Sequence, residues 1–455
     1  MKLAWLVTFI ITYQLTAILS APTIVYADEP PDEPQAMQRT FIAPLADKDI
    51  FRTSIANLNK INPLGEALQA VDMPDLGFSL VTGSFTDEES DKLRSQGYQE
   101  PDSLEVSLFA DGACEARRRL EPVMGDKLVQ PSVCRVIGSP SPVTNGSAVW
   151  IIDSGVDDDV VTNGLLTISE RINCMVTPCS KVIGVPDHQG HGTMVAGIIG
   201  GMRVQSGTSG QYLGIVGVSP GVPLKIVKAF EDKKSKIVGP PLVALQYVRD
   251  NASAGQILNI SWGAEFMETA RKGGQLDLLG QMDKLLFEIA NKQVRIVIAA
   301  GNAQEDDEPS WVQSFFPANA SEYVSPNPTQ GFIQSVSASD STYIKAGTTG
   351  TGACSTVSGD WCDLPWNGGA FGAAMSEPGV GVQVLWRSTD NHKLRQNICS
   401  GTSLAAPVLA GLLARNPANL PKVPIKKGVI PNADQLGYST AGKPDVTDPD
   451  YPTCN

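Results

Sequence analysis

The sequence predicts an α/β protein in which helices cover both faces of a mostly parallel sheet, with a small α+β unit ahead of it. Two observations support this fold class. After Ser147, short apolar runs alternate with helical stretches and Gly-rich turns, and the 455 residues are 42% hydrophobic, which is enough for a sizeable core. In folds of this kind, ligands and catalytic groups gather at the carboxyl ends of the strands.

Four apolar runs are the predicted strands of the parallel sheet. They comprise residues 148–152, 224–227, 256–260 and 294–299. Strands of this composition are expected where both sides of a sheet are buried. Residues 275–292, between the last two runs, have the apolar spacing of an amphipathic helix, so a strand, helix, strand unit is predicted there.

Residues 1–27 are predicted to be a signal peptide. One positive charge, Lys2, precedes an apolar stretch from Leu3 to Leu19, and Val25-Tyr26-Ala27 supplies a small-residue exit. An uncleaved anchor is the alternative, because the stretch is close to the ~17-residue minimum for a span. The predicted localisation is secreted or periplasmic, with no membrane contact after removal of the signal.

Residues 28–119 are predicted to form a propeptide or accessory domain, beginning with an acidic, Pro-rich linker over 28–40. Its clearest part is a helix between two strands, in which Thr86 and Glu89 form a capping box. Arg117-Arg118-Arg119 at its end is either a processing site or an exposed basic turn.

The main domain is predicted over residues 120–415, and a Pro-rich tail packed on its surface over 416–455. No internal repeat is evident. We expect the protein to be a monomer.

Charge and cysteine content exclude one function class and indicate a compartment. Asp plus Glu number 48 and Lys plus Arg 35, so the net charge is −13, which argues against nucleic acid as a partner. The eight cysteines form an even set, as in disulfide-bonded exported proteins. Cys174 with Cys179 and Cys354 with Cys362 are guesses at the pairing, which the sequence leaves open.

Three polar residues follow or open the predicted elements in glycine-flanked turns. Asp153 follows the first apolar run, His191 lies between two glycines at the start of an apolar helix, and Ser403 lies at the start of another. Helix N-termini offer unpaired N–H groups to a developing oxyanion. An Asp, a His and a Ser so placed are what nucleophilic acyl transfer requires.

These blocks resemble the signature motifs of a known family. Asp153-Ser154-Gly155, Gly190-His191-Gly192-Thr193 and Gly401-Thr402-Ser403-Leu404-Ala405-Ala406-Pro407 are similar to the three blocks of subtilisin-like serine peptidases, in the order Asp, His, Ser. Ala299-Ala300-Gly301-Asn302 resembles the oxyanion-hole segment of that family. The resemblance covers about residues 147–414 and implies the subtilisin-like three-layer fold.

The resemblance also implies a role for each residue. Ser403 is expected to be the nucleophile, His191 the base, and Asp153 the group that orients the imidazole. Asn302 is expected to donate its side-chain amide to the oxyanion, together with the N–H of Ser403. Two backbone edges, Ser261-Trp262-Gly263 and Ala299-Ala300-Gly301, are expected to bind an extended substrate between them.

No metal or cofactor is expected to take part in the reaction. A pair of ligands at His188 and His191 is an alternative interpretation, but only Asp187 offers a further ligand nearby. Calcium is an alternative as a structural ion, at Asp157-Asp158-Asp159 or at Glu305-Asp306-Asp307-Glu308, although neither run has EF-hand spacing.

The predicted function is therefore that of a secreted serine endopeptidase made as a zymogen. Its partners are protein or peptide substrates and its own propeptide. The alternative from a different class is a catalytically silent subtilisin-like scaffold that acts as a binding module. A third alternative, the acid-acting Ser/Glu/Asp relative of this fold, is disfavoured by His191 and Asn302. The absence of a carboxylate from Ala299-Ala300-Gly301 favours apolar or aromatic residues before the scissile bond.

Overall fold

The structure is a computed structural model, and the predicted signal peptide and most of the Pro-rich tail lie outside its described residues. In that part of the chain, no helix combines the length and the hydropathy needed to cross a bilayer. The described residues are 37–61, 68–101, 106–108, 115–119, 123–124, 131–137, 141–206, 211–231, 234–235, 239–265, 278–302, 314–321, 332–345, 361–366, 369–370, 373–387, 394–415, 422–424 and 437–439.

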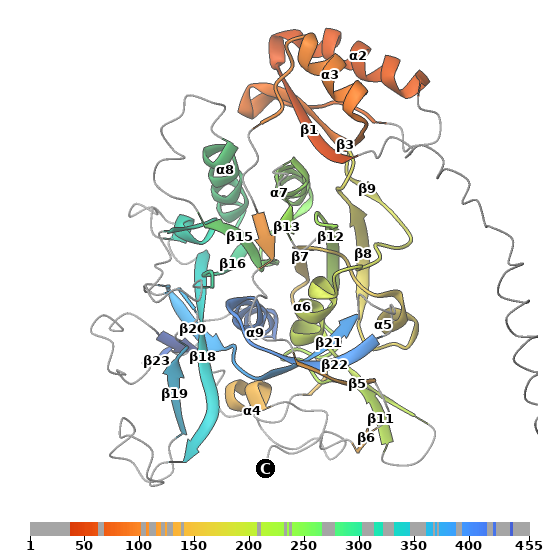
Figure 1. Ribbon diagram of the computed structural model, residues 1–455. Coiled ribbons are helices and arrows are strands. Elements are labelled where there is room, and N and C mark those ends of the chain that lie inside the picture. The colour runs from red at the N-terminus through yellow and green to blue at the C-terminus, as the bar shows by residue number, and fades with distance from the viewer. Residues whose placement is uncertain are drawn as a thin grey trace, which may run out of the picture.

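An 11-stranded sheet forms the centre of the molecule (Figure 1). Its middle strands are β7 (Val149–Asp153), β12 (Leu224–Lys228), β14 (Ile257–Ile260) and β16 (Arg295–Ala299), which confirm the four predicted runs. Neighbouring pairs among them, β12 with β7, β7 with β14 and β14 with β16, are all parallel. Because the strands are parallel, they all end at the same edge of the sheet.

Outer strands extend this sheet on both sides. The full order is β23-β24-β20-β18-β16-β14-β7-β12-β8-β9, with β19 paired to β18. The pairings of β8 with β12 and of β18 with β16 and β20 are parallel, whereas β9, β19 and β23 pair antiparallel. The bounds are β8 (Ile168–Asn173), β9 (Ser180–Lys181), β18 (Ile333–Lys345), β19 (Trp361–Pro365), β20 (Met375–Pro378), β23 (Lys422–Pro424) and β24 (Gly437–Ser439).

Helices cover both faces of the sheet, so the predicted three-layer α/β class is confirmed (Figure 1). On one face, α6 (His191–Gly200) packs against α9 (Thr402–Arg415), and α9 contacts β14, β16, β18 and β20. On the other face, α7 (Gly239–Asn251) packs against α8 (Leu278–Asn291). The helix predicted over 275–292 is α8. The short helices α4 (Pro131–Ile137) and α5 (Asp158–Thr162) lie at the periphery.

The accessory unit is a three-stranded antiparallel sheet with two helices. Its order is β1 (Met37–Pro44), β3 (Phe78–Phe85), β2 (Val71–Met73), and the helices are α2 (Lys48–Ile61) and α3 (Asp87–Ser95). The predicted capping box is present at α3: Thr86 Oγ1 accepts from the Glu89 N–H, and the Glu89 carboxylate accepts from the Thr86 N–H.

Both faces of this small sheet are apolar and buried. Phe41 and Phe85 belong to the face that packs against α2 and α3. Ile42 and Leu80 point to the opposite face and join the same apolar cluster as the main core. The main domain therefore covers one face of the accessory sheet, as a partner protein does at an interface.

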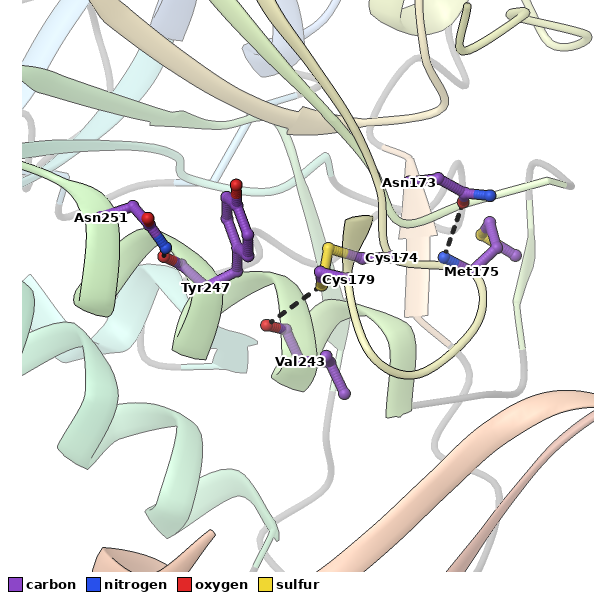
Figure 2. The surroundings of a disulfide bond; sticks show 7 residues. All are labelled: Asn173, Cys174, Met175, Cys179, Val243, Tyr247 and Asn251. Atoms are coloured by element: carbon purple, nitrogen blue, oxygen red, sulfur yellow. Dashed lines mark hydrogen bonds between the residues drawn. A yellow bond between two sulfur atoms is a disulfide. The ribbon is translucent and has the colours of Figure 1, made fainter. Parts of the chain in front are cut away.

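A disulfide loop of the main domain contacts the accessory sheet. Cys174 and Cys179 are joined by an S–S bond of 2.00 Å, as guessed, and Cys179 Sγ lies 3.7 Å from the carbonyl oxygen of Val243 on α7 (Figure 2). Within this loop, Thr177 donates its N–H to the carbonyl oxygen of Thr82 on β3 and accepts the Thr82 N–H on its hydroxyl, both at 3.2 Å.

Three further small sheets complete the fold. One has the order β13 (Lys234–Ser235), β4 (Val106–Leu108), β15 (Trp262–Glu265), β17 (Phe315–Phe316). The others are β21 (Val382–Arg387) with β22 (Leu394–Cys399) and β5 (Glu115–Arg119), and β10 (Arg203–Gln205) with β11 (Gln211–Gly214) and β6 (Val123–Met124).

The Arg117-Arg118-Arg119 run lies within β5 and pairs with β22 of the main domain. The chain thus contributes to the main domain from Glu115 onward. The predicted boundary at residue 119 stays a prediction, but this pairing favours a boundary between β4 and β5.

An ion-pair cluster joins β8, β12 and β9 and gives a pH-dependent prediction. Glu170 accepts from Lys225 at 2.7 Å and from Lys181 at 2.6 Å. Burial of the carboxyl opposes its ionisation, but the hydrogen bonds from both lysines outweigh it, so the pKa of Glu170 is lowered. A lowered carboxyl pKa stabilises the fold at neutral pH and loses this effect as the pH falls through the folded-state value.

We expect Glu170→Gln to reduce the free energy of unfolding at pH 7 by about 1 kcal/mol or less, because the cluster is partly exposed. The difference from wild type should shrink as the pH is lowered below about 4. Urea unfolding across this pH range measures it, with Lys181→Gln as the milder comparison. A difference that stays constant with pH would contradict the ion-pair explanation.

Candidate active site

Three elements bring the predicted catalytic residues together. Asp153 is the last residue of β7, His191 is the first residue of α6, and Ser403 is the second residue of α9. The end of β7 and the N-termini of α6 and α9 meet at the carboxyl edge of the parallel sheet, where such folds place their ligands. All three residues are almost completely buried, with exposed fractions of 0, 2 and 0%.

Asp153 and His191 form the central pair of the site. Nδ1 of His191 lies 2.8 Å from Oδ1 and 3.0 Å from Oδ2 of Asp153. Because a carboxylate only accepts, Nδ1 carries the proton and Nε2 keeps its lone pair. Nε2 is buried and has no hydrogen-bond partner among the described residues. The imidazole is therefore held in the tautomer that a general base needs.

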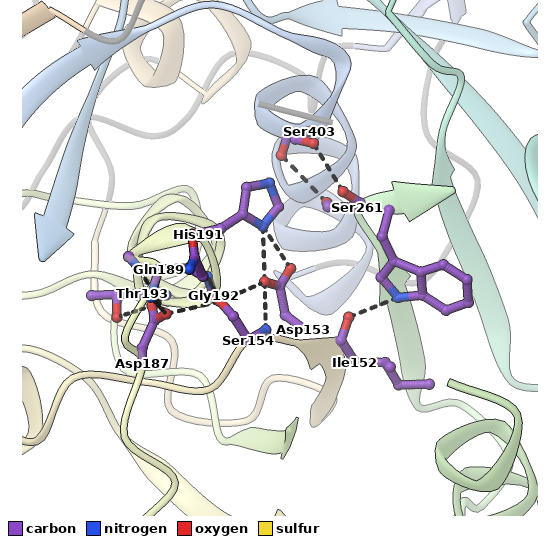
Figure 3. Close-up of polar contacts among 12 residues, drawn as sticks. Ile152, Asp153, Ser154, Asp187, Gln189, His191, Gly192, Thr193, Ser261 and Ser403 are labelled. Carbon is purple, nitrogen blue, oxygen red and sulfur yellow. Dashed lines mark hydrogen bonds and ion pairs between the residues drawn. The ribbon is translucent and has the colours of Figure 1, made fainter. Parts of the chain in front are cut away.

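Ser403 lies beside this pair, but its hydroxyl is bonded elsewhere. Figure 3 shows the imidazole of His191 between Asp153 and Ser403. The Ser403 hydroxyl donates to the main-chain oxygen of Ser261 at 2.9 Å, and the Ser261 hydroxyl donates to the carbonyl oxygen of Ser403 at 3.3 Å. Rotation about the Cα–Cβ bond of Ser403, from one staggered rotamer to another, turns the hydroxyl away from Ser261.

The amide of Asn302 is oriented by Thr402, a residue to which the sequence analysis assigned no role. Asn302 Oδ1 accepts from the N–H of Thr402 at 3.0 Å and from its hydroxyl at 2.9 Å. The Thr402 hydroxyl in turn accepts the N–H of Gly301 at 3.2 Å. Because Oδ1 accepts both bonds from Thr402, Nδ2 is the donor atom of the Asn302 amide, and its N–H₂ group lies in the amide plane beside Oδ1.

A second buried carboxylate, Asp187, connects the turn after β7 to the start of α6. Its Oδ1 accepts from the N–H groups of Gly190 at 2.7 Å and Gln189 at 3.1 Å, and from the Ser154 hydroxyl at 2.8 Å. Its Oδ2 accepts from the N–H and the hydroxyl of Thr193, at 2.8 and 2.6 Å. Asp187 thus holds the start of the helix that carries His191.

Ser154 continues this network to the pair formed by Asp153 and His191. Its N–H donates to Asp153 Oδ1 at 2.8 Å, and its hydroxyl accepts the N–H of Gly192 at 3.0 Å. The ammonium group of Lys228, at the end of β12, donates to the carbonyl oxygens of Ser154 at 2.9 Å and Pro186 at 2.7 Å. A buried cation thus lies on the backbone that carries the two buried carboxylates. The sequence analysis included Ser154 only as part of the Asp153-Ser154-Gly155 motif, without a role, and did not identify Lys228, because these contacts join distant parts of the chain.

The first predicted substrate edge is occupied by another part of the same chain. In β15, Trp262 pairs with Leu108 and Gly263 with Ser107 of β4, in antiparallel register. On its other side, β4 pairs with β13. The sequence analysis did not identify β13 as a neighbour of this strand.

The other predicted edge, Ala299-Ala300-Gly301, is not paired with β4. The Ala300 N–H donates to the carbonyl oxygen of Val336 at 2.9 Å, and the Gly301 carbonyl accepts the Ala370 N–H at 2.9 Å. Gly301 has φ +106°, and a Cβ atom there would lie 2.3 Å from the ring of Phe315. Only glycine fits this position, where the backbone turns against an aromatic ring.

The alternative metal sites find no support in the geometry. His188 is paired with Glu231, not with a cluster that includes His191. Asp157 caps α5 by accepting the Asp159 N–H at 2.8 Å. No group of three or more His, Cys, Asp or Glu side chains in the described part of the chain could hold a metal ion. His392 and the acidic run 305–308 lie outside that part, and a structural calcium ion stays a prediction.

Asp187→Asn tests the importance of the hydrogen bonds that join Asp187 to Ser154 and to the start of α6. The new amide N–H₂ group would face backbone N–H donors, so buried donors would lose their acceptor. We expect a loss of about 3 kcal/mol or more in the free energy of unfolding, the magnitude found when one partner of a buried charged network is removed. Urea denaturation measures it. Asp158→Asn, an exposed residue of α5, is the matched control, and equal stability of the two variants would contradict the role of Asp187.

Two curated proteins are similar to this chain in sequence. Subtilisin-like protease 2 of Plasmodium falciparum is 28% identical over 175 residues, which cover 37% of this chain and 12% of that protein. Subtilisin-like protease 3 of Pseudogymnoascus destructans is 27% identical over 282 residues, 60% of this chain and 53% of that protein. The chain thus spans about half or less of the length of these relatives.

A solved structure shares the fold. The epidermin leader peptide processing serine protease of Staphylococcus aureus superposes with a TM-score of 0.51 at 16% identity, over 89% of this chain and 97% of that one. A model described as the subtilase family matches residues 144–437, more than half of the sequence. This chain therefore belongs to the subtilase family.

Proposed function

We propose that the chain is a serine endopeptidase that hydrolyses peptide bonds through an acyl-enzyme on Ser403. The observation that carries this proposal is the Asp153–His191 pair, with Nδ1 held at 2.8 Å and Nε2 left as an acceptor. A binding module that had lost its activity would have no need to keep two buried ionisable groups in this arrangement, since burying them costs free energy.

The reaction begins with proton transfer from Ser403 to His191. The hydroxyl leaves the carbonyl oxygen of Ser261, gives its proton to Nε2, and Oγ attacks the substrate carbonyl carbon. Asp153 stabilises the imidazolium that forms. Nε2 then returns the proton to the leaving amine, and water hydrolyses the acyl-enzyme by the same route in reverse.

The developing oxyanion lies at the N-terminus of α9. The N–H of Ser403 and the side-chain N–H₂ of Asn302 are its proposed donors, and Thr402 fixes the Asn302 amide with two hydrogen bonds to Oδ1. Donors that are already in place need no reorganisation when charge develops, which lowers the barrier.

The accessory unit is the proposed propeptide, and it inhibits the enzyme by covering the site. Support comes from the ladder between β4 and β15, which occupies the edge assigned to substrates, and from the burial of the sheet face that contains Ile42 and Leu80. An ion pair adds to the contact, since the guanidinium group of Arg249 on α7 lies 3.2 Å from the carboxylate of Asp75. A chain-derived strand in the cleft keeps the proform inactive until it is cut.

An oxidising, extracytoplasmic compartment is the proposed location. The disulfide between Cys174 and Cys179 supports it, because such bonds persist outside the cytosol. The predicted signal peptide over 1–27 agrees with it.

Ser403→Ala tests the activity. We expect the variant to remain at its full unprocessed length, to lose casein hydrolysis and to escape labelling by a fluorophosphonate, because the nucleophile is absent. Gel analysis and label incorporation measure these outcomes. Ser400→Ala, three residues earlier in the same turn, is the control and should still be labelled. Casein hydrolysis by Ser403→Ala would contradict the assignment.

Thr402→Val tests how Asn302 is oriented. Without the hydroxyl, Asn302 Oδ1 loses one of its two donors, so we expect kcat to fall about tenfold, less than the several hundredfold typical when an oxyanion donor is lost outright. KM should change less than kcat, because the Thr402 hydroxyl contacts the predicted substrate edge only by accepting the Gly301 N–H. Steady-state kinetics on a peptide substrate measure both, and Thr402→Ser should restore kcat. A parallel loss in Thr402→Ser would point to packing instead.

A further inference from the structure

The pairing of β4 leaves one of the two predicted substrate edges without a strand. β4 pairs with β15 on one side, where Leu108 lies opposite Trp262, and with β13 on the other. The second predicted edge, Ala299-Ala300-Gly301, belongs to neither ladder. A substrate main chain that lies along β15 therefore leaves the space beside this second edge to a substrate side chain.

The two predicted edges begin as neighbours and then separate. Ile260 of β14 pairs with Ile298 of β16 in the central sheet. The chain after Ile260 turns away into β15, whereas Ala299 continues to pair with Val336 of β18. The residues that follow Ile260 and Ile298 thus border a common space, which is widest where the chains diverge.

In the proposed mechanism, the side chain before the scissile bond enters this space. The substrate carbonyl carbon must come within bonding distance of Oγ of Ser403, and its oxygen must lie at the N–H₂ group of Asn302. Asn302 follows the second edge directly, and Figure 3 shows Ser403 beside Ser261, the first residue of the other edge. The Cα atom of the substrate residue, one bond from that carbon, then lies between Ser261 and Gly301.

The ring of Phe315 occupies the same space. Its main chain pairs with Glu265 of β15, and β17 lies on the side of β15 opposite β4. The ring reaches Gly301, because a Cβ atom built there would lie 2.3, 2.5 and 2.6 Å from three of the ring carbons. Phe315 is only 2% exposed, so the ring is packed in this position. One aromatic side chain therefore spans the distance from β15 to the second edge.

The neighbouring side chains of β15 do not share this space. Trp262 donates its indole N–H to the carbonyl oxygen of Ile152 at 3.0 Å, and its ring centroid lies 5.4 Å from that of Phe230. Because successive residues of a strand face opposite sides, Gly263 faces away from this cluster, and it has no side chain. Among the described residues of β15 and β17, Phe315 is thus the one whose side chain reaches the second edge.

The strand that carries this ring is bonded to two other strands. Phe316 pairs with Ala264 of β15, and both are buried. In the short helix that follows, the Ser321 hydroxyl donates to the Ser335 hydroxyl of β18 at 2.8 Å. A large substrate side chain could displace the ring only by disturbing these packed elements.

We propose that Phe315 restricts the enzyme to substrates with a small residue, namely glycine, alanine or serine, immediately before the scissile bond. The proposal rests on the proposed peptidase activity and adds its substrate class. A larger side chain would need volume that the ring already fills, and overpacking of a dense interior is unfavourable. This preference differs from the apolar or aromatic one expected from Ala299-Ala300-Gly301 alone, because that motif does not include the distant Phe315.

Cleavage-site profiling of the wild-type enzyme tests this preference. Full-length protein, in the form that hydrolyses casein, is incubated with a peptide library, and mass spectrometry reads the residue before each cut bond. We expect glycine, alanine and serine to dominate there. Matched peptides with alanine or phenylalanine at this place should differ in kcat/KM by at least about tenfold in favour of alanine. Predominant cleavage after large apolar residues would overturn the proposal.

Phe315→Ala should weaken this discrimination, because it removes the ring from the space. We expect kcat/KM for the phenylalanine peptide to rise at least about tenfold relative to that for the alanine peptide. Phe316→Ala is the matched control, since it removes the neighbouring buried ring and should leave the ratio unchanged. An equal shift in both variants would indicate a general loosening of the fold and would refute the role of Phe315.

Phe315→Leu covers the case in which Phe315→Ala does not fold. Leucine keeps an apolar side chain and frees only part of the ring volume, so the ratio should move in the same direction by a smaller factor. An unchanged ratio in folded Phe315→Leu would also overturn the proposal. If the wild-type protein shows neither casein hydrolysis nor fluorophosphonate labelling, the proposed peptidase activity itself is wrong, whereas cleavage after large residues leaves that activity intact.

Discussion

The burial of two carboxylates, Asp153 and Asp187, is the constraint on which the site depends. Neither is exposed, and an uncompensated charge there would cost several kcal/mol. Both are satisfied through the same residue: Ser154 donates its N–H to Asp153 and its hydroxyl to Asp187. Since Asp187 also takes two N–H groups ahead of α6 and one within its first turn, the end of β7 and the start of α6 form one hydrogen-bonded unit. The position of the His191 imidazole follows from the satisfaction of these charges.

The accessory unit depends on the main domain in a comparable way. A small sheet usually packs one face on its own helices and leaves the other in water. Here Phe41 faces α2 and α3, while Ile42, its neighbour on β1, is buried against the main core. Separation would expose this second apolar face, which favours the assembled state. The pairing of β4 with β15 adds main-chain hydrogen bonds to this contact.

Local patterns were sufficient for most of the fold and for the residue types of the site. The four apolar runs became β7, β12, β14 and β16, and the capping box at Thr86 marked the start of α3, because these signals are contained in a few consecutive residues. The missed features depend on long-range contacts. β13 has two residues and no periodicity, and Asp187 was visible only as a possible metal ligand. The hydrogen bond from Ser403 to Ser261 joins residues 142 positions apart, which no local pattern encodes.

The glycines that follow Asp153 and His191 have a separate consequence. A Cβ atom on Gly192 would lie 2.2 Å from the carbonyl oxygen of Gly155, so the turn after Asp153 and the first turn of α6 touch through backbone alone. The Asp153-Ser154-Gly155 motif and the Gly190-His191-Gly192 motif therefore pack against each other backbone to backbone. A side chain at position 192 could be accommodated only if the backbone moved. A descendant that had lost its nucleophile would still need both glycines in order to fold. Recognition of such glycine pairs in a genome identifies the architecture, and only the side chains between them distinguish a working enzyme from an inactive copy.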